Sequence, residues 1–295
     1  MAEHSRAISL VVCDLAGTVV DHGSRAPAAA FVELFARHGI IATEAQAREP
    51  MGMHKRDHIE RMLSMPELAR QWEKIHGQRW NVADLDSLFA EFIPIQTTLL
   101  EAHADVIAGA AETVAGLRAR GIKVAVTTGY NRPMTDLVLE TAAHQGLAFD
   151  FSICAAEVPA GRPAPWMIFR CMEATGAYPP SAVLNIGDTI ADIESGVNAE
   201  VWTAGIALTG NLLGLSHRDT WALPEGQRKA HLVSIYERMY EAGAHKVIDS
   251  ITDIESVISF VANAGAKRHP ADRRESHLDD ARIHEFPPAV GRGGI

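Results

Sequence analysis

The first apolar run of the chain predicts a buried strand. Residues 8–13 are almost all apolar and include several β-branched side chains. A short, continuous run of this kind is typical of a strand that is covered on both faces. It ends at Asp14, and Gly17 and Thr18 follow in a segment that we expect to be a loop. The pattern therefore places Asp14 at the carboxyl end of a parallel strand.

A helical pattern follows and continues to residue 101. Apolar side chains recur at helical spacing, Gly39 provides a stop signal, and residues 43–46 have the form of a capping box. We predict helices at 27–38, 55–64, 66–76 and 83–101. Residues 23–101 show no strand pattern. This segment is predicted to be a helical insertion.

Strands and helices alternate in the next part of the chain. The predicted helices are 112–120, 133–145, 164–175 and 190–199, and the predicted strands are 122–127, 149–154, 183–186 and 201–206. Such alternation indicates a parallel sheet with helices on both faces. We predict an α/β fold with a doubly wound parallel core. Its limits are residues 1–22 and 103–264, with an inserted α-helical cap domain at residues 23–102.

The last segment, residues 265–295, mixes charged residues with proline and glycine and is predicted to be a disordered tail.

The composition of the chain narrows the function classes. Hydrophobic residues make up 47% of the chain, enough for a sizeable core, and the net charge of -10 argues against a nucleic-acid partner.

The expected location is the cytoplasm. Cys13, Cys154 and Cys171 are widely spaced and odd in number, which favours reduced thiols over a disulfide framework. The N-terminal residues lack an apolar signal core, and no apolar run reaches the ~18 residues of a membrane span. We therefore expect a cytoplasmic enzyme with no membrane partner.

Polar residues stand at four successive predicted strand ends. Asp14 ends the first strand, Thr128 the second, and Asp188 the fourth, with Asp192 one helical turn later; Arg162 follows the third strand after a loop. Ligands of open parallel sheets bind at the carboxyl ends of the strands. An aspartate at one strand end is more often only a turn or a helix cap, so the order of the whole set carries the argument.

Phosphoryl transfer is the chemistry that such a set supports. A carboxylate such as Asp14 attacks phosphorus and forms an aspartyl phosphate. The Thr128 hydroxyl and the Arg162 guanidinium hold phosphoryl oxygens. Asp188 helps to hold a hard cation, normally Mg²⁺, which lets two anions approach each other. The sequence therefore predicts a magnesium-dependent site.

This order of residues resembles the haloacid dehalogenase superfamily. The family motif Asp-x-Asp has a second aspartate that protonates the leaving group, and Ala16 stands at that position here. An alkoxide leaving group needs a proton, so an enzyme without this acid is expected to be a poor phosphomonoesterase. A carbon leaving group needs no such acid when a protonated imine delocalises its charge.

Lys55 is the candidate for the imine. It opens a predicted helix shortly after Gly52, and a helix N-terminus disfavours an ammonium group. His58 lies on the same helix face and could relay a proton. Each residue alone has a plainer interpretation: a solvated lysine, a surface or capping histidine and, for Met51, ordinary core packing.

A closer resemblance is to the phosphonoacetaldehyde hydrolases, or phosphonatases. It extends over residues 7–262, and its most specific elements are Ala16 and the context of Lys55. The segments that carry it are 14–21, 50–58, 127–130, 161–167, 187–192 and 240–245.

This resemblance implies roles for individual residues and a homodimer formed through the cap. The substrate would be phosphonoacetaldehyde, with Asp14 as nucleophile and Lys55 as the imine-forming amine. It further implies Mg²⁺ ligands (Asp14, Asp188 and the Ala16 carbonyl), a residue that supports the metal's waters (Asp192), phosphate-binding residues (Thr128 and Arg162), residues that assist the imine (Met51 and His58), and a glycine that lets the cap loop approach the core (Gly52).

Departures from the family pattern are modest, at Leu15, Ser24, His54 and Glu200. Two alternatives remain. A phosphomonoesterase or sugar-phosphate mutase on the same fold is disfavoured by Ala16. A non-catalytic phosphate or metabolite sensor is disfavoured by the retained Asp14, Lys55 and Asp188, because binding alone needs no nucleophile.

Overall fold

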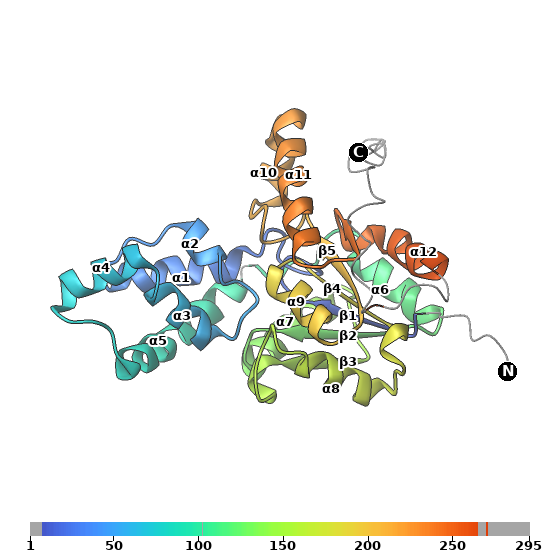
Figure 1. Cartoon of the computed structure of the whole chain (residues 1–295), viewed down its shortest axis with the longest axis horizontal. Helices are drawn as coiled ribbons and strands as arrows, with labels where there is room; N and C mark the ends of the chain where they lie inside the picture. The colour runs from blue at the N-terminus through green and yellow to red at the C-terminus, as the bar shows by residue number, and fades with distance from the viewer. Residues whose placement is uncertain (1–7, 102, 265–269, 271–295) are drawn as a thin grey trace.

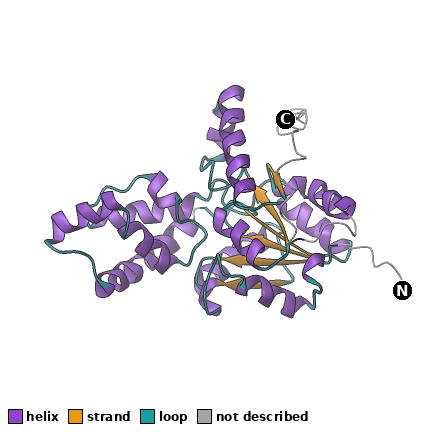
Figure 2. Cartoon of the chain, viewed as in Figure 1, coloured by secondary structure: helices purple, strands orange, loops and turns teal. Residues whose placement is uncertain are grey.

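Six parallel strands form the centre of the molecule. The computed structural model describes residues 8–101, 103–264 and 270. Within them the sheet order is β3-β2-β1-β4-β5-β6, with helices on both faces (Figure 2). This confirms the predicted doubly wound fold. The strands are β1 (Leu10–Asp14), β2 (Lys123–Thr128), β3 (Phe151–Cys154), β4 (Val183–Gly187), β5 (Trp202–Ile206) and β6 (Lys246–Ile248).

β1 is apolar throughout because both of its faces are covered. Leu10 and Val12 join one core cluster, whereas Val11 and Cys13 join another on the opposite face. Successive side chains of a strand point to opposite faces, so a strand between two helix layers needs apolar residues at every position. The apolar run thus holds Asp14 at the end of one of the two central strands.

The part of the chain that carries the sheet also contributes seven described helices. They are α6 (Ala110–Ala119), α7 (Arg132–His144), α8 (Trp166–Thr175), α9 (Ile190–Asn198), α10 (His217–Ala222), α11 (Glu225–Glu241) and α12 (Ile254–Ala264). Every strand and helix predicted from the sequence agrees with the structure to within two residues at each end. The patterns missed the elements after β5, where the remaining strand has only three residues.

Five helices make up a separate lobe beside the sheet (Figure 1). They are α1 (Arg25–Arg37), α2 (Glu44–Arg48), α3 (Lys55–Leu63), α4 (Pro66–His76) and α5 (Val82–Glu101). They pack around their own apolar cluster, which includes Phe31, Ile59 and Phe92. α2 opens with the predicted capping box, in which the side chains of Thr43 and Gln46 each accept the other's backbone N–H. We refer to this lobe as the cap.

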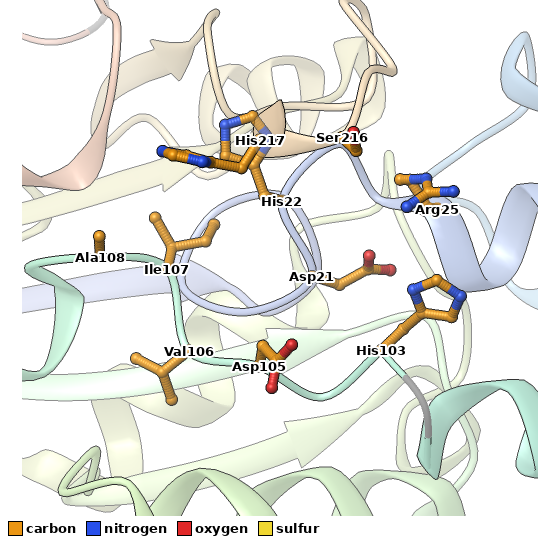
Figure 3. Close-up of a pocket in the computed structure, with 10 residues that line it drawn as sticks. All are labelled: Asp21, His22, Arg25, His103, Asp105, Val106, Ile107, Ala108, Ser216 and His217. Carbon is orange, nitrogen blue, oxygen red and sulfur yellow. The ribbon is translucent and has the colours of Figure 1, made fainter. Parts of the chain in front are cut away.

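Two linkers join the cap to the sheet domain, and hydrogen bonds tie them together. The N–H of Asp21 donates to the carbonyl of Asp105 (3.0 Å), and the N–H of Ile107 donates to that of Val19 (2.9 Å). A cavity of about 300 Å³ lies between these linkers and the start of α10, with His217 at its edge (Figure 3). The two linkers are therefore held side by side where the cap joins the sheet domain.

The predicted tail, residues 265–295, lies outside the described residues apart from Pro270. In the part of the chain that is described, none of the helices combines the length and the apolar character that crossing a membrane requires.

Candidate active site

Three buried carboxylates meet where the strand order reverses. β1 and β4 are neighbours in the sheet, but the chain leaves them toward opposite edges. This arrangement opens a crevice at their carboxyl ends. Asp14, Asp188 and Asp192 lie there, with one oxygen of each within 4.8 Å of the others. The structure therefore brings together the carboxylates that the sequence placed at two separate strand ends.

The loop after β1 shapes the surroundings of Asp188. Gly17 has a φ of 87°, and a Cβ added to it would lie 2.1 Å from an Asp188 carboxylate oxygen. Only glycine fits at this position. The Thr18 hydroxyl donates to Asp188 Oδ1 (3.4 Å), and the backbone N–H of Asn211 donates to Oδ2 (2.7 Å). Both carboxylate oxygens are therefore oriented.

Arg162 bridges the other two carboxylates. Its guanidinium donates to Asp14 Oδ1 (2.7 Å), to Asp192 Oδ1 (2.9 Å) and to the carbonyl of Thr127 (3.0 Å). The side chain is buried. Arg162 thus holds the nucleophile candidate in place and presents a positive charge beside it.

The carboxylates carry more negative charge than Arg162 balances. Burial, followed by the Asp14 and Asp192 charges, raises the pKa of Asp188 well above its ordinary value. Burial also raises the pKa of Asp192 to about 6, although Arg162 opposes this. Among the described residues Asp188 has no ion pair, so a hard divalent cation fits the oxygen donors of this cluster.

Lys55 reaches the same place from the cap. It is the first residue of α3, its side chain is buried, and it lines a cavity of about 20 Å³ together with Asp14, Ala16, Thr128 and Arg162. That volume holds about one water molecule. Burial lowers the pKa of Lys55 to about 8, although the Asp14 charge acts in the opposite direction. A neutral amine is therefore accessible near neutral pH.

Apolar groups also flank the Lys55 amine. Nζ lies 5.5 Å from the ring centroid of Phe31 and 5.4 Å from that of Tyr130. The sulfur of Met51 is 4.0 Å away. Aromatic rings and a thioether stabilise an ammonium group less than a carboxylate does. The loss of solvation therefore dominates the shift of the Lys55 pKa.

Glycines let the cap loop that precedes α3 contact the sheet domain. Gly52 has a φ of 93°, and a Cβ there would lie 2.4 Å from the Thr189 hydroxyl oxygen. A Cβ on Gly129 would lie 2.7 Å from the carbonyl oxygen of Met53. Larger residues at either position would separate the two surfaces and move Lys55 away from Asp14.

His58 occupies a different position from the other predicted residues. Its ring stacks on Phe31 with centroids 3.6 Å apart, and Nε2 donates to the carbonyl of Ala47 (2.9 Å). Nδ1 has no hydrogen-bond partner among the described residues. Burial, followed by the Lys55 charge, keeps the pKa of His58 well below its ordinary value. It is a neutral imidazole near Lys55 that does not line the small cavity.

One neighbour of the site, Asn211, was not identified from the sequence. It contacts Asp188 through its backbone N–H, which leaves no mark on residue type. Thr127 lies in one of the segments that carry the resemblance, and it accepts hydrogen bonds from Arg162 through both its carbonyl and its hydroxyl. Two departures from the family pattern do not line the small cavity. Leu15 belongs to the sheet core. His54 precedes α3 and packs near Phe89, with ring centroids 5.8 Å apart.

Comparison with known proteins agrees with this geometry. Residues 8–200 match the family model described as haloacid dehalogenase-like hydrolase. A phosphonoacetaldehyde hydrolase from Nitratidesulfovibrio vulgaris is 42% identical over 86% of this chain and 91% of its own length. One from Bacillus cereus is 38% identical over 86% of this chain and 96% of its own length.

Similarities to solved structures agree with these sequence matches. A phosphonoacetaldehyde hydrolase-like protein from Oleispira antarctica superimposes with a TM-score of 0.86 and 38% identity, covering 88% of this chain and 94% of that one. A β-phosphoglucomutase from Clostridium difficile, 17% identical with a TM-score of 0.63, shares the fold. The chain is therefore a haloacid dehalogenase-like hydrolase. Within that class it belongs to the phosphonoacetaldehyde hydrolase family.

Proposed function

We propose that this enzyme hydrolyses the carbon–phosphorus bond of phosphonoacetaldehyde to give acetaldehyde and phosphate. One observation carries the proposal. A buried lysine with a pKa of about 8 faces the nucleophile candidate Asp14 across a cavity where Ala16 stands in place of an acid. This arrangement suits a leaving group that is a carbanion stabilised by an imine, and it does not suit an alkoxide.

The residues act in a definite order. The neutral Lys55 amine condenses with the aldehyde and becomes a protonated imine. Asp14 attacks phosphorus, and the carbon leaves as an enamine that is then protonated and hydrolysed to acetaldehyde. Water cleaves the aspartyl phosphate. Thr128 and Arg162 hold the phosphoryl oxygens during the transfer.

Other cap residues support the imine. Met51 contacts the Lys55 amine through sulfur, and Gly52 allows the loop that precedes Lys55 to lie against the sheet domain. His58 is neutral and is therefore able to accept a proton, although its ring lies beside Phe31 rather than in the small cavity. The nearly filled cavity implies that the cap opens to admit substrate and closes for reaction.

Mg²⁺ is the cofactor that we propose. Asp14, Asp188 and the carbonyl of Ala16 would hold it, and Asp192 would support its waters. Three buried carboxylates with a single guanidinium between two of them fit a hard cation. The cation would reduce the repulsion between Asp14 and the phosphoryl oxygens.

Phosphate release from phosphonoacetaldehyde, compared with a panel of phosphate esters, tests the proposed activity. We expect release from the phosphonate and little release from the esters. The reverse preference would favour a phosphomonoesterase or a mutase on this fold. Tight phosphate binding without turnover would favour the sensor.

A homodimer formed through the cap and a cytoplasmic location complete the proposal. Large apolar side chains are exposed on the cap at Ile41, Ile75 and Val82, and a partner subunit would cover such positions. All three cysteines are unpaired, as expected in a reducing compartment. Light scattering of the wild type and of Ile41→Lys would test the dimer, and an unchanged mass for the variant would exclude Ile41 from the interface.

A further inference from the structure

Arg48, the last residue of α2, extends from the cap to the sheet domain. Its Nη1 donates to the carbonyl of Gly23 (2.8 Å) and to the side-chain oxygen of Asn211 (3.1 Å). Its Nη2 donates to the carbonyl of Gly214 (2.9 Å). The side chain is only 13% exposed. One guanidinium therefore joins the cap, the linker after β1 and the loop after β5.

Asn211 extends this contact to the carboxylate cluster. Its side-chain amide donates to the carbonyl of Arg48 (3.2 Å), and its backbone N–H donates to Asp188 Oδ2 (2.7 Å). The fit around the guanidinium is tight, because a Cβ on Gly214 would lie 2.7 Å from Arg48 Nε. A movement of Arg48 would therefore disturb the residue that orients Asp188.

The same carbonyl of Arg48 is also linked to the loop that leads to Lys55. It accepts the backbone N–H of Met51 (3.2 Å), and Met51 contacts the Lys55 amine through its sulfur. Arg48 thus lies between the two halves of the site. On one side the contacts lead to the amine, and on the other they lead to Asp188.

We propose that Arg48 is a positioning residue that couples closure of the cap to the orientation of Asp188 through Asn211. The inference rests on the proposed function, because it assumes that the cap opens and closes during turnover. Opening would separate the guanidinium from Asn211 and Gly214, and closing would restore these contacts. A buried guanidinium is stable only when its N–H groups find acceptors, so the acceptors on Asn211 and Gly214 favour the closed position.

The test compares Arg48→Ala, Arg48→Lys, Asn211→Ala and the double alanine variant with the wild type. Arg61→Ala is a matched control, because Arg61 is a cap arginine that pairs with Glu49 (2.7 Å) at the surface. Three quantities are measured: Mg²⁺ affinity of the substrate-free protein by calorimetry, kcat and KM with phosphonoacetaldehyde, and thermal unfolding.

We expect both alanine variants to weaken Mg²⁺ binding ~10-fold and to lower kcat/KM by ~10- to 100-fold, because each loses charge-assisted hydrogen bonds. The double variant should lose less than the product of the two single losses, since both belong to one network. Arg48→Lys should recover only part of the loss, because an ammonium cannot reproduce the guanidinium fork. Arg61→Ala should stay within about twofold of the wild type in both measurements.

Wild-type Mg²⁺ affinity in both single variants would overturn the inference, as would losses that multiply in the double variant. A lower unfolding temperature with unchanged affinity and kcat/KM would leave Arg48 only a structural role and would also overturn it. If Arg48→Ala does not fold, Asn211→Ala alone decides, because it keeps the guanidinium. Failure of the wild type to act on phosphonoacetaldehyde would refute the proposed function, while the Mg²⁺ comparison would still decide the role of Arg48.

Discussion

The pKa of Lys55 gives the most direct test of the proposed chemistry, because only the neutral amine condenses with an aldehyde. Burial lowers this pKa from an ordinary 10.5 to about 8. At pH 7 about 10% of the amine is then neutral, compared with about 0.03% for an ordinary lysine, a gain of roughly 300-fold. The rate of imine formation should rise about tenfold per pH unit below 8 and level off above it.

The assay is a borohydride quench. The enzyme in EDTA is mixed with acetaldehyde at each pH, quenched after a short time with excess borohydride, and digested for mass spectrometry. The two-carbon adduct on Lys55 is measured against that on Lys74, which is exposed on α4. The Lys55 midpoint should lie near 8, well below that of Lys74.

Two variants test the cause of the shift. Asp14→Asn removes the charge that opposes desolvation, so the midpoint of Lys55 should move to lower pH while trapping persists. Lys55→Arg keeps a positive charge but forms no adduct, and its turnover should fall at least ~10³-fold because the carbanion loses its sink. A wild-type midpoint near 10.5, an upward shift in Asp14→Asn, or an adduct on another lysine would refute the reasoning.

Three further outcomes are expected. EDTA should abolish turnover and Mg²⁺ should restore it, and a fully active metal-free enzyme would contradict this metal requirement. Asp188→Asn should bind Mg²⁺ more weakly than the wild type in calorimetry. Ala16→Asp should lower phosphonatase activity, because it adds a negative charge beside Asp14, and it should not create an efficient phosphomonoesterase. Steady-state assays on the phosphonate and on phosphate esters measure both activities, and wild-type activity on the phosphonate would contradict the prediction. Gly52→Ala should lower kcat/KM ~10²-fold, because the new Cβ would lie 2.4 Å from the Thr189 hydroxyl oxygen and would hold the cap open. Kinetics within twofold of the wild type would show that the loop adjusts.

Local patterns predicted most of the fold because secondary structure depends on short-range periodicity. The apolar run before Asp14 and the capping box at Thr43 were each readable within a few residues, and both agree with the structure. β6 was missed because three residues are too few for an alternating pattern. The domain limits and the roles of the site residues stay predictions.

The sequence by itself determined the chemical groups of the site: a carboxylate at the end of the first strand, an alanine in place of the acid, and a lysine in the cap. These depend on residue identity and on position along the chain. Only the tertiary structure decided their environment. The pKa of Lys55 follows from burial between two domains, and the orientation of Asp188 follows from a backbone N–H at Asn211. Burial and backbone contacts arise from segments far apart in the chain, so no local pattern could contain them.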